Sequence, residues 1–200
     1  MDRIEGVVAF CSRGIMHSRT FESIWRNLEG RRGDWDLVAS HGLPIPDAQN
    51  AVTGRALALG PSWLWFVEED MLPEPGTLSR MLEAGSRRDV VTVDYKLEDG
   101  SKAISFREGN LDYGGMGCLL VKAKVFDKIR KPWFDTLAYN GMGGSLPFRL
   151  NYGGQDVFFF KRLTEAGIEV EVIEATVDHL RVRKSGDPGS NNGAHEIVKL

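Results

Sequence analysis

The chain has 200 residues, 42% of them hydrophobic and 26% charged, and carries a formal net charge of −3 at pH 7. This composition excludes a globally disordered chain, and the net charge provides no overall attraction to nucleic acid or to an anionic membrane surface. The length is that of one domain with its own hydrophobic core.

No run approaches the roughly 20 consecutive apolar residues of a membrane-spanning helix. The first residues, Met1 to Glu5, are charged, and the apolar run after them is shorter than the core of a signal peptide. Cys11 and Cys118 both lie in apolar runs and are predicted to be free thiols in a reducing compartment. We therefore expect a cytoplasmic protein without a membrane span.

Short apolar runs alternate with amphipathic segments over the first half of the chain. Unbroken apolar runs bounded by Gly and Pro are typical of strands buried on both faces, and they predict strands at residues 7–10, 36–40, 63–67 and 89–93. The segments between them predict helices at residues 18–28, 48–59 and 77–84. This alternation predicts a parallel sheet with right-handed crossovers.

Two of these helices carry specific expectations. The first has an apolar stripe that is predicted to pack into the core, formed by Phe21, Ile24, Trp25 and Leu28. Asp47 precedes the second helix and is predicted to be its N-cap.

Polar residues follow the first and third predicted strands directly. Ser12 and Arg13 come after the first strand, and the acidic run Glu68-Glu69-Asp70 comes after the third. Ligands of open α/β sheets bind beyond the carboxyl ends of such strands. Glu68 and Asp70 are two residues apart and are predicted to point the same way, as oxygen ligands suited to Mg²⁺ or Mn²⁺. A solvated acidic turn is the alternative.

The second half of the chain is richer in glycine. Gly114, Gly115 and Gly117 precede a predicted strand that ends at Val121; they permit either close approach to a ligand or a β-bulge at a sheet crossing. A short helix at residues 122–129, a glycine-rich substrate loop at 138–154, a helix at 157–166 and a strand at 168–173 are expected to follow in that order.

Two further polar residues stand at the ends of these elements. Asp156 opens the helix that Gly167 is predicted to end, and His179 lies in a polar segment after the last predicted strand. Residues 181–200 are predicted to be a flexible basic tail that contains Arg181, Arg183 and Lys184.

The order of an acidic strand end, a glycine-rich strand, an aspartate at a helix start and a late histidine resembles the GT-A glycosyltransferases, especially the small family 2-like enzymes of bacteria and phages. The resemblance covers roughly residues 6–182. It implies a single-domain, Rossmann-like α/β/α sandwich with a mostly parallel central sheet and a small antiparallel addition. Residues 1–95 would form the nucleotide-binding half and residues 96–180 the acceptor and catalytic half, within the cytoplasm of a bacterium or of an infected host cell.

The resemblance also implies a metal and a base. The family's Asp-x-Asp motif corresponds to Glu68 and Asp70, and its distant histidine to His179, so that Mn²⁺ or Mg²⁺ would bridge the diphosphate of a nucleotide-sugar donor. Glu68 replaces an aspartate and has a longer side chain, which makes Asp70 the expected direct ligand. Asp156 matches the base of inverting members, and Gln155 replaces the glutamate that precedes it.

Donor-binding residues follow from the same resemblance. The loop at Cys11, Ser12 and Arg13 would contact the base, and Gly114 and Gly115 would line the donor sugar. The family often carries an Arg-Asn pair that corresponds to residues 49 and 50. Asn50 matches the asparagine, and Gln49 replaces the arginine. Further donor contacts are expected from Arg55, Glu69, Arg181, Arg183 and Lys184, although Glu69 is predicted to face away from the metal and Arg55 can equally be a solvent-facing charge.

The expected activity is sugar transfer from a nucleotide-diphosphate sugar to an acceptor hydroxyl. A sugar-nucleotide pyrophosphorylase and a nucleotide-sugar-binding module without turnover remain alternatives. A haloacid-type phosphatase is disfavoured because no aspartate follows the first strand. The acceptor stays open between a small molecule, a protein hydroxyl, a glycan and a modified DNA base.

Overall fold

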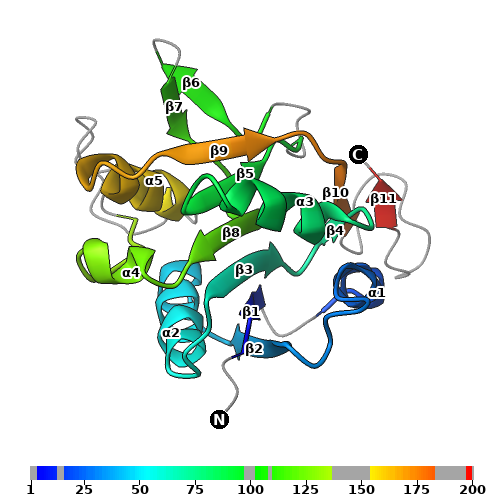
Figure 1. Ribbon diagram of the computed structural model, residues 1–200. Coiled ribbons are helices and arrows are strands. Elements are labelled where there is room, and N and C mark those ends of the chain that lie inside the picture. Colours follow the sequence, from blue (N-terminus) through cyan, green and yellow to red (C-terminus); the bar gives the residue numbers. More distant parts are fainter. Residues whose placement is uncertain are drawn as a thin grey trace.

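The computed structural model describes residues 4–12, 16–96, 102–107, 110–136, 154–182 and 197–199. Its central sheet has six strands in the order β2-β1-β3-β8-β5-β9 (Figure 1). These are β1 (Gly6–Ser12), β2 (Trp35–His41), β3 (Trp63–Glu68), β5 (Val90–Val93), β8 (Cys118–Lys122) and β9 (Val170–Ile173). β8 runs antiparallel to both of its neighbours, and the other five strands run the same way. The expectation of a mostly parallel central sheet is confirmed.

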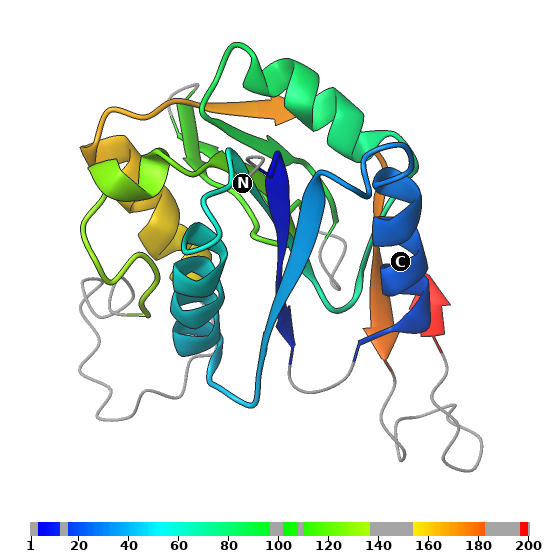
Figure 2. The ribbon, with the colours of Figure 1, turned by 60° about the horizontal axis from the view of Figure 1, so that its bottom comes forward.

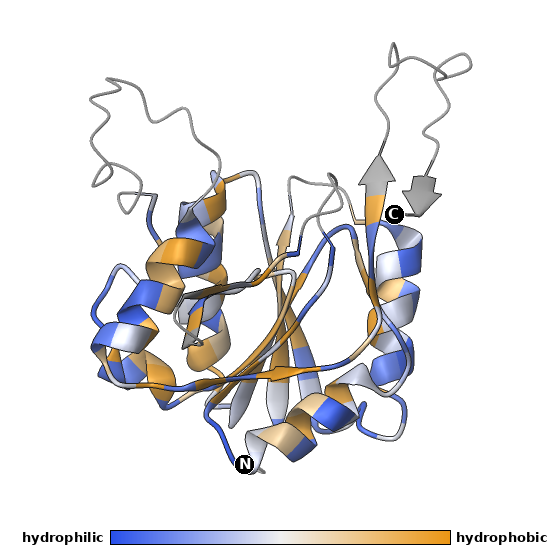
Figure 3. Cartoon of the chain, turned by 90° about the horizontal axis from the view of Figure 1, so that it is seen from above, coloured by the Kyte–Doolittle hydropathy of each residue, from blue (hydrophilic) through white to orange (hydrophobic). Residues whose placement is uncertain are grey.

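Helices cover both faces of this sheet (Figure 2). α2 (Ile45–Leu57), α4 (Val125–Lys128) and α5 (Gln155–Glu165) pack on one face, and α1 (Ser18–Asn27) and α3 (Thr77–Gly85) pack on the other. Because successive strand residues point to opposite faces, Phe66 packs with the first group and its neighbour Trp65 with the second. Figure 3 shows hydrophobic strands between helices in which hydrophobic and hydrophilic residues alternate. The predicted α/β/α sandwich is confirmed.

Two small antiparallel units extend the sandwich. The strands β6 (Ser105–Arg107) and β7 (Asn110–Tyr113) pair as a hairpin, and β10 (Val177–Val182) pairs with both β4 (Met71–Pro73) and β11 (Ile197–Lys199). His179 therefore lies in a strand, opposite Met71, and not in an irregular polar segment. Within the predicted flexible tail, Arg181 and Val182 pair with Val198 and Ile197 in strands, whereas residues 183–196 lie outside the described residues.

The apolar stripe of α1 is only partly in the core. Ile24 and Leu28 are buried, but the side chains of Phe21 and Trp25 are 47% and 45% exposed and stack on each other. Hydrogen bonds of Asn27, near the end of α1, explain how the helix is oriented. The Asn27 amide donates to the carbonyl of Pro73 and accepts from the N–H of Leu78. A buried polar residue thus turns α1 toward β4 and α3, away from the side that carries Phe21 and Trp25.

Helix boundaries differ from the prediction in places. α2 begins at Ile45 and has a proline in its first turn, so that Asp47 lies inside the helix and does not cap it. Proline suits this place because the first turn needs no N–H donor. α4 is confined to Val125–Lys128, and α5 ends before Gly167, whose φ of 66° is the left-handed conformation expected there. Among the described residues, no helix has the length and apolar character required to cross a membrane.

Candidate functional site

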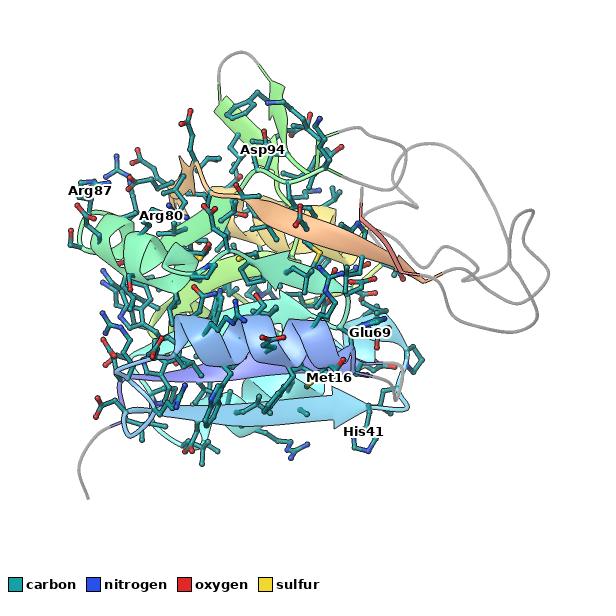
Figure 4. All side chains as sticks on the ribbon, turned by 90° about the vertical axis from the view of Figure 1, so that its right-hand side faces the viewer. Met16, His41, Glu69, Arg80, Arg87 and Asp94 are labelled. Atoms are coloured by element: carbon teal, nitrogen blue, oxygen red, sulfur yellow. The ribbon has the colours of Figure 1, made fainter. Side chains whose placement is uncertain are left out.

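The candidate site lies at the edge of the sheet where the parallel strands end. β1 and β3 finish side by side, with Cys11 in register with Glu68, and the N–H of Glu68 donates to the carbonyl of Gly117 just before β8. Figure 4 shows Glu69 at this edge, together with His41 at the end of β2, whereas Arg87 lies toward the opposite edge. This is the edge at which open α/β sheets bind their ligands.

Glu69 belongs to the first strand end. The Ser12 hydroxyl donates to its carboxylate over 2.8 Å, and the backbone carbonyl of Glu69 accepts from the Thr20 hydroxyl over 2.9 Å. The residue therefore connects the end of β1 with the start of α1. Its side chain is directed to Ser12, at the place where the sequence predicts the donor-binding loop.

Asp70 and His179 meet across the pairing of β4 with β10. The N–H of Leu180 donates to the carbonyl of Asp70 over 2.6 Å, and the side chains approach within 3.3 Å between the Asp70 Oδ2 and His179 Nε2 atoms. Both side chains are largely buried, with 20% and 16% exposure. Two residues more than a hundred positions apart thus form one polar pair.

This pair fits a divalent cation as two adjacent ligands. With ligand distances of about 2.1 Å and octahedral geometry, neighbouring ligand atoms are roughly 3 Å apart, close to the observed separation. In the part of the chain that the structure describes, no group of three or more His, Cys, Asp or Glu residues is arranged to hold a metal. The remaining ligands would be phosphate oxygens and water, as is usual for Mg²⁺.

Glu68 does not join this pair as a third ligand. Its charge contributes to the raised pKa of the Cys11 thiol and of the Tyr95 hydroxyl. The prediction that Glu68 and Asp70 point the same way assumes a strand through residue 70, but β3 ends at Glu68 and the chain turns at residues 69 and 70. Strand alternation does not hold across a turn.

Asp156 lies in the first turn of α5 and accepts hydrogen bonds from its own N–H and from that of Met116. Burial raises the pKa of this carboxyl above its ordinary value, and the two hydrogen bonds offset only part of that effect. A carboxylate with a raised pKa is suited to take up a proton.

Tyr95 is a site residue that the sequence does not single out. It follows β5, its side chain is only 6% exposed, and its hydroxyl accepts the N–H of Gly117 over 2.9 Å. Burial raises the pKa of the phenol well above its ordinary value, and the charges of Glu68 and Asp156 act in the same direction. The available signal was its place directly beyond the carboxyl end of a buried strand.

The glycine-rich segment serves protein packing. A Cβ atom on Gly115 would lie 2.1 Å from the Tyr95 hydroxyl, and one on Gly114 would lie 2.8 Å from Cζ of Phe160. Both glycines are therefore required by neighbouring side chains of the protein itself. These contacts account for both glycines without a ligand, and the lining of a donor sugar by Gly114 and Gly115 stays a prediction.

Asn50 and Arg55 also have roles other than the predicted donor binding. The Asn50 amide donates to the carbonyls of Pro46 and Phe134, each over 2.8 Å, and accepts from the N–H groups of Trp133 and Phe134 over 3.0 and 3.3 Å. Arg55 is exposed and donates to the carbonyl of Ala39 on the edge strand β2. Asn50 thus uses both of its donors and two acceptor positions to attach α2 to residues 133–134.

Both cysteines are buried free thiols, as predicted. Burial raises the pKa of Cys11 to about 12, with a further contribution from Glu68, and burial raises that of Cys118 to about 12 as well. Neither thiol is therefore ionised at neutral pH.

Four of the predicted donor-binding side chains lie outside the part of the chain that the structure describes: those of Arg13, Arg181, Arg183 and Lys184.

No protein-family model matches the chain, and no curated protein matches it. Among solved structures, A197 from STIV is similar over 88% of this chain and 85% of its own, with a TM-score of 0.63 and 16% identity. CMP:2-keto-3-deoxy-manno-octonic acid synthetase complexed with CTP is similar over 85% of this chain and 89% of its own, with a TM-score of 0.47 and 12% identity. A putative nucleotide-diphospho-sugar transferase from Desulfovibrio desulfuricans G20 is similar over 86% of this chain and 80% of its own, with a TM-score of 0.46 and 11% identity. The likeness to A197 concerns the fold, and the two looser ones add nothing to it.

Proposed function

We propose that the chain is a metal-dependent glycosyltransferase of the GT-A type that uses a nucleotide-diphosphate sugar as donor. The observation that carries this proposal is that the Asp156 carboxyl, through the N–H of Met116 before β8, lies on the same edge of the sheet as the Asp70–His179 pair. A proton acceptor and a pair suited to a cation are the two groups that an inverting, metal-dependent sugar transfer uses.

In the proposed reaction, Asp156 takes the proton of an acceptor hydroxyl while the hydroxyl oxygen bonds to the anomeric carbon of the sugar. The bond from that carbon to the diphosphate oxygen breaks, and its electron pair leaves with the diphosphate. Attack opposite the leaving group inverts the anomeric centre. General-base help of this kind typically contributes about 10²–10⁴-fold in rate.

Asp70 and His179 would hold Mn²⁺ or Mg²⁺. Once bound, the cation supplies positive charge that neutralises the departing diphosphate. Ser12 and Glu69 lie at the adjoining strand end, where their hydrogen bond holds the Ser12 side chain at the place proposed for the nucleotide.

A donor screen tests this proposal. UDP-, GDP- and CDP-sugars are compared by thermal shift with and without Mn²⁺, and the stabilising donor is then assayed for release of the nucleoside diphosphate. We expect the Asp156→Asn variant to bind that donor normally and to lose turnover about 100-fold or more. Asp47→Asn is the matched control, because Asp47 also lies in a first helical turn but is exposed.

Full turnover by Asp156→Asn contradicts the assignment of the base. Release of pyrophosphate from a nucleoside triphosphate and a sugar phosphate, without sugar transfer, would instead identify a sugar-nucleotide pyrophosphorylase. Donor stabilisation without any turnover would identify a binding module.

A further inference from the structure

The side chain of Tyr95 contacts His179 and the backbone N–H of Gly117. Its hydroxyl accepts the N–H of Gly117 over 2.9 Å, and its ring packs edge-to-face against His179, with the ring centroids 6.4 Å apart. His179 is in turn the partner of Asp70. Tyr95 itself takes no part in the proposed reaction.

Residues 115–117 wrap around the Tyr95 hydroxyl. A Cβ on Gly115 would lie 2.1 Å from that oxygen and one on Gly117 would lie 2.6 Å from it, so only glycine fits on either side. The residue between the two glycines, Met116, donates its N–H to the carboxylate of Asp156. The hydroxyl, the backbone of 115–117 and the Asp156 carboxylate therefore form one continuous series of contacts.

The same backbone segment is attached to the acidic strand end. The N–H of Glu68 donates to the carbonyl of Gly117 over 3.3 Å, while the N–H of Gly117 donates to Tyr95. Both polar groups of Gly117 are thus used at the site. A shift of this segment would move the Met116 N–H away from Asp156.

We propose that Tyr95 is a positioning residue, which sets the place of Asp156 relative to the Asp70–His179 pair through its hold on residues 115–117. The inference rests on the proposed function of Asp156 as the base. Burial and the nearby carboxylates keep the phenol protonated, so its hydroxyl stays a neutral hydrogen-bonding group at the pH of the reaction.

The Tyr95→Phe variant tests this inference, because it keeps the ring against His179 and removes only the hydroxyl. We expect kcat for donor turnover to fall about 10- to 100-fold with the KM for the donor little changed, since small misplacements of a reacting group have effects of that size. We also expect the pKa of Asp156, followed by ¹³C NMR of its carboxyl, to rise further as the Met116 hydrogen bond weakens. Tyr113→Phe, which makes the same change on β7, is the control and should alter neither quantity.

An unchanged Asp156 pKa together with an unchanged kcat in Tyr95→Phe overturns the inference. A loss of stability alone would also overturn it, because a purely structural hydroxyl lowers the free energy of unfolding without moving that pKa. The NMR measurement needs no turnover. It therefore still decides the role of Tyr95 if Asp156→Asn keeps full activity and the proposed function fails.

A double-mutant cycle keeps the test valid if Tyr95→Phe folds poorly. Gly115→Ala should destabilise the protein less in the Tyr95→Phe background than in the wild type, because the added Cβ no longer meets the hydroxyl oxygen. Equal losses in the two backgrounds would show that the segment does not wrap around this hydroxyl.

Discussion

Asp156 lies half-buried in the first turn of α5, and desolvation of its carboxyl raises its pKa above the value of about 3.9 that an aspartate has in an unfolded chain. Between these two pKa values, the folded protein keeps a proton on Asp156 that the unfolded chain has lost. Stability contributed by this group is therefore present below the unfolded pKa and is lost as pH rises through the folded pKa. Asp156, the proposed base, therefore lowers the free energy of unfolding at neutral pH.

The Asp156→Asn variant tests this linkage. Since asparagine does not titrate, we expect the wild type to lose free energy of unfolding relative to the variant as pH rises from 4 to 7, so that the variant is the more stable protein at pH 7. Urea unfolding of both proteins at unit pH intervals measures the difference, and Asp36→Asn on the exposed side of β2 controls for the substitution itself. A difference that is constant with pH would contradict the assigned direction of the shift.

His179 permits a test of the cation site that does not need a substrate. A Mn²⁺ concentration ten times its dissociation constant should stabilise the wild type by about 1.4 kcal/mol. We expect His179→Ala to lose most of this stabilisation because one of the two protein ligands is gone. His41→Ala, in an exposed place at the end of β2, should keep it. Equal Mn²⁺ effects in the wild type and both variants would exclude the Asp70–His179 pair as the site.

At the scale of elements, Asn50 determines how α2 and residues 133–134 are joined. The Asn50→Ala variant leaves the N–H groups of Trp133 and Phe134 without their acceptor, and each unsatisfied buried group costs about 1–3 kcal/mol. We expect the free energy of unfolding to fall by about that amount while the KM for a donor stays unchanged. Arg55→Ala on the exposed face of the same helix should stay within about 0.5 kcal/mol of the wild type. A raised KM with normal stability would restore the donor-binding role.

The pairing of β4 with β10 brings the Asp70–His179 pair together. Met71 lies opposite His179, which places β10 beside the segment that directly follows the acidic end of β3. The sequence contains an acidic run and a distant histidine, but the pairing of the two short strands decides that Asp70 and not Glu68 meets the histidine.

At the scale of the whole molecule, one sheet supports both hydrophobic clusters. Trp65 and Phe66 are neighbours on β3 and are buried on opposite faces, so the loss of either helical layer exposes one face of a strand that also supports the other layer. We expect a single unfolding transition in urea, with tryptophan fluorescence and far-UV circular dichroism changing together. Two resolved transitions would show that the layers unfold separately.

The parts of the fold that could be predicted are those that depend on burial. Apolar runs such as 63–67 indicated buried strands, and amphipathic segments such as 77–84 indicated helices, because hydrophobic periodicity follows burial directly. The antiparallel direction of β8 and the pairing of β10 were not predictable in this way, since an apolar run has the same composition in either direction. The exposure of Phe21 and Trp25 likewise depended on the contacts of Asn27 with other elements.

The sequence by itself determined a two-layered covering of a mostly parallel sheet, the acidic end of β3 and the aspartate at the start of α5, because each of these depends on residues close together in the chain. Only the tertiary structure decided that Asp70 meets His179, that the glycines before β8 enclose the Tyr95 hydroxyl, and that Asn50 joins α2 to its neighbours. These three features are contacts between distant segments. Their geometry depends on strand direction, register and turns, which local patterns of hydrophobicity do not encode.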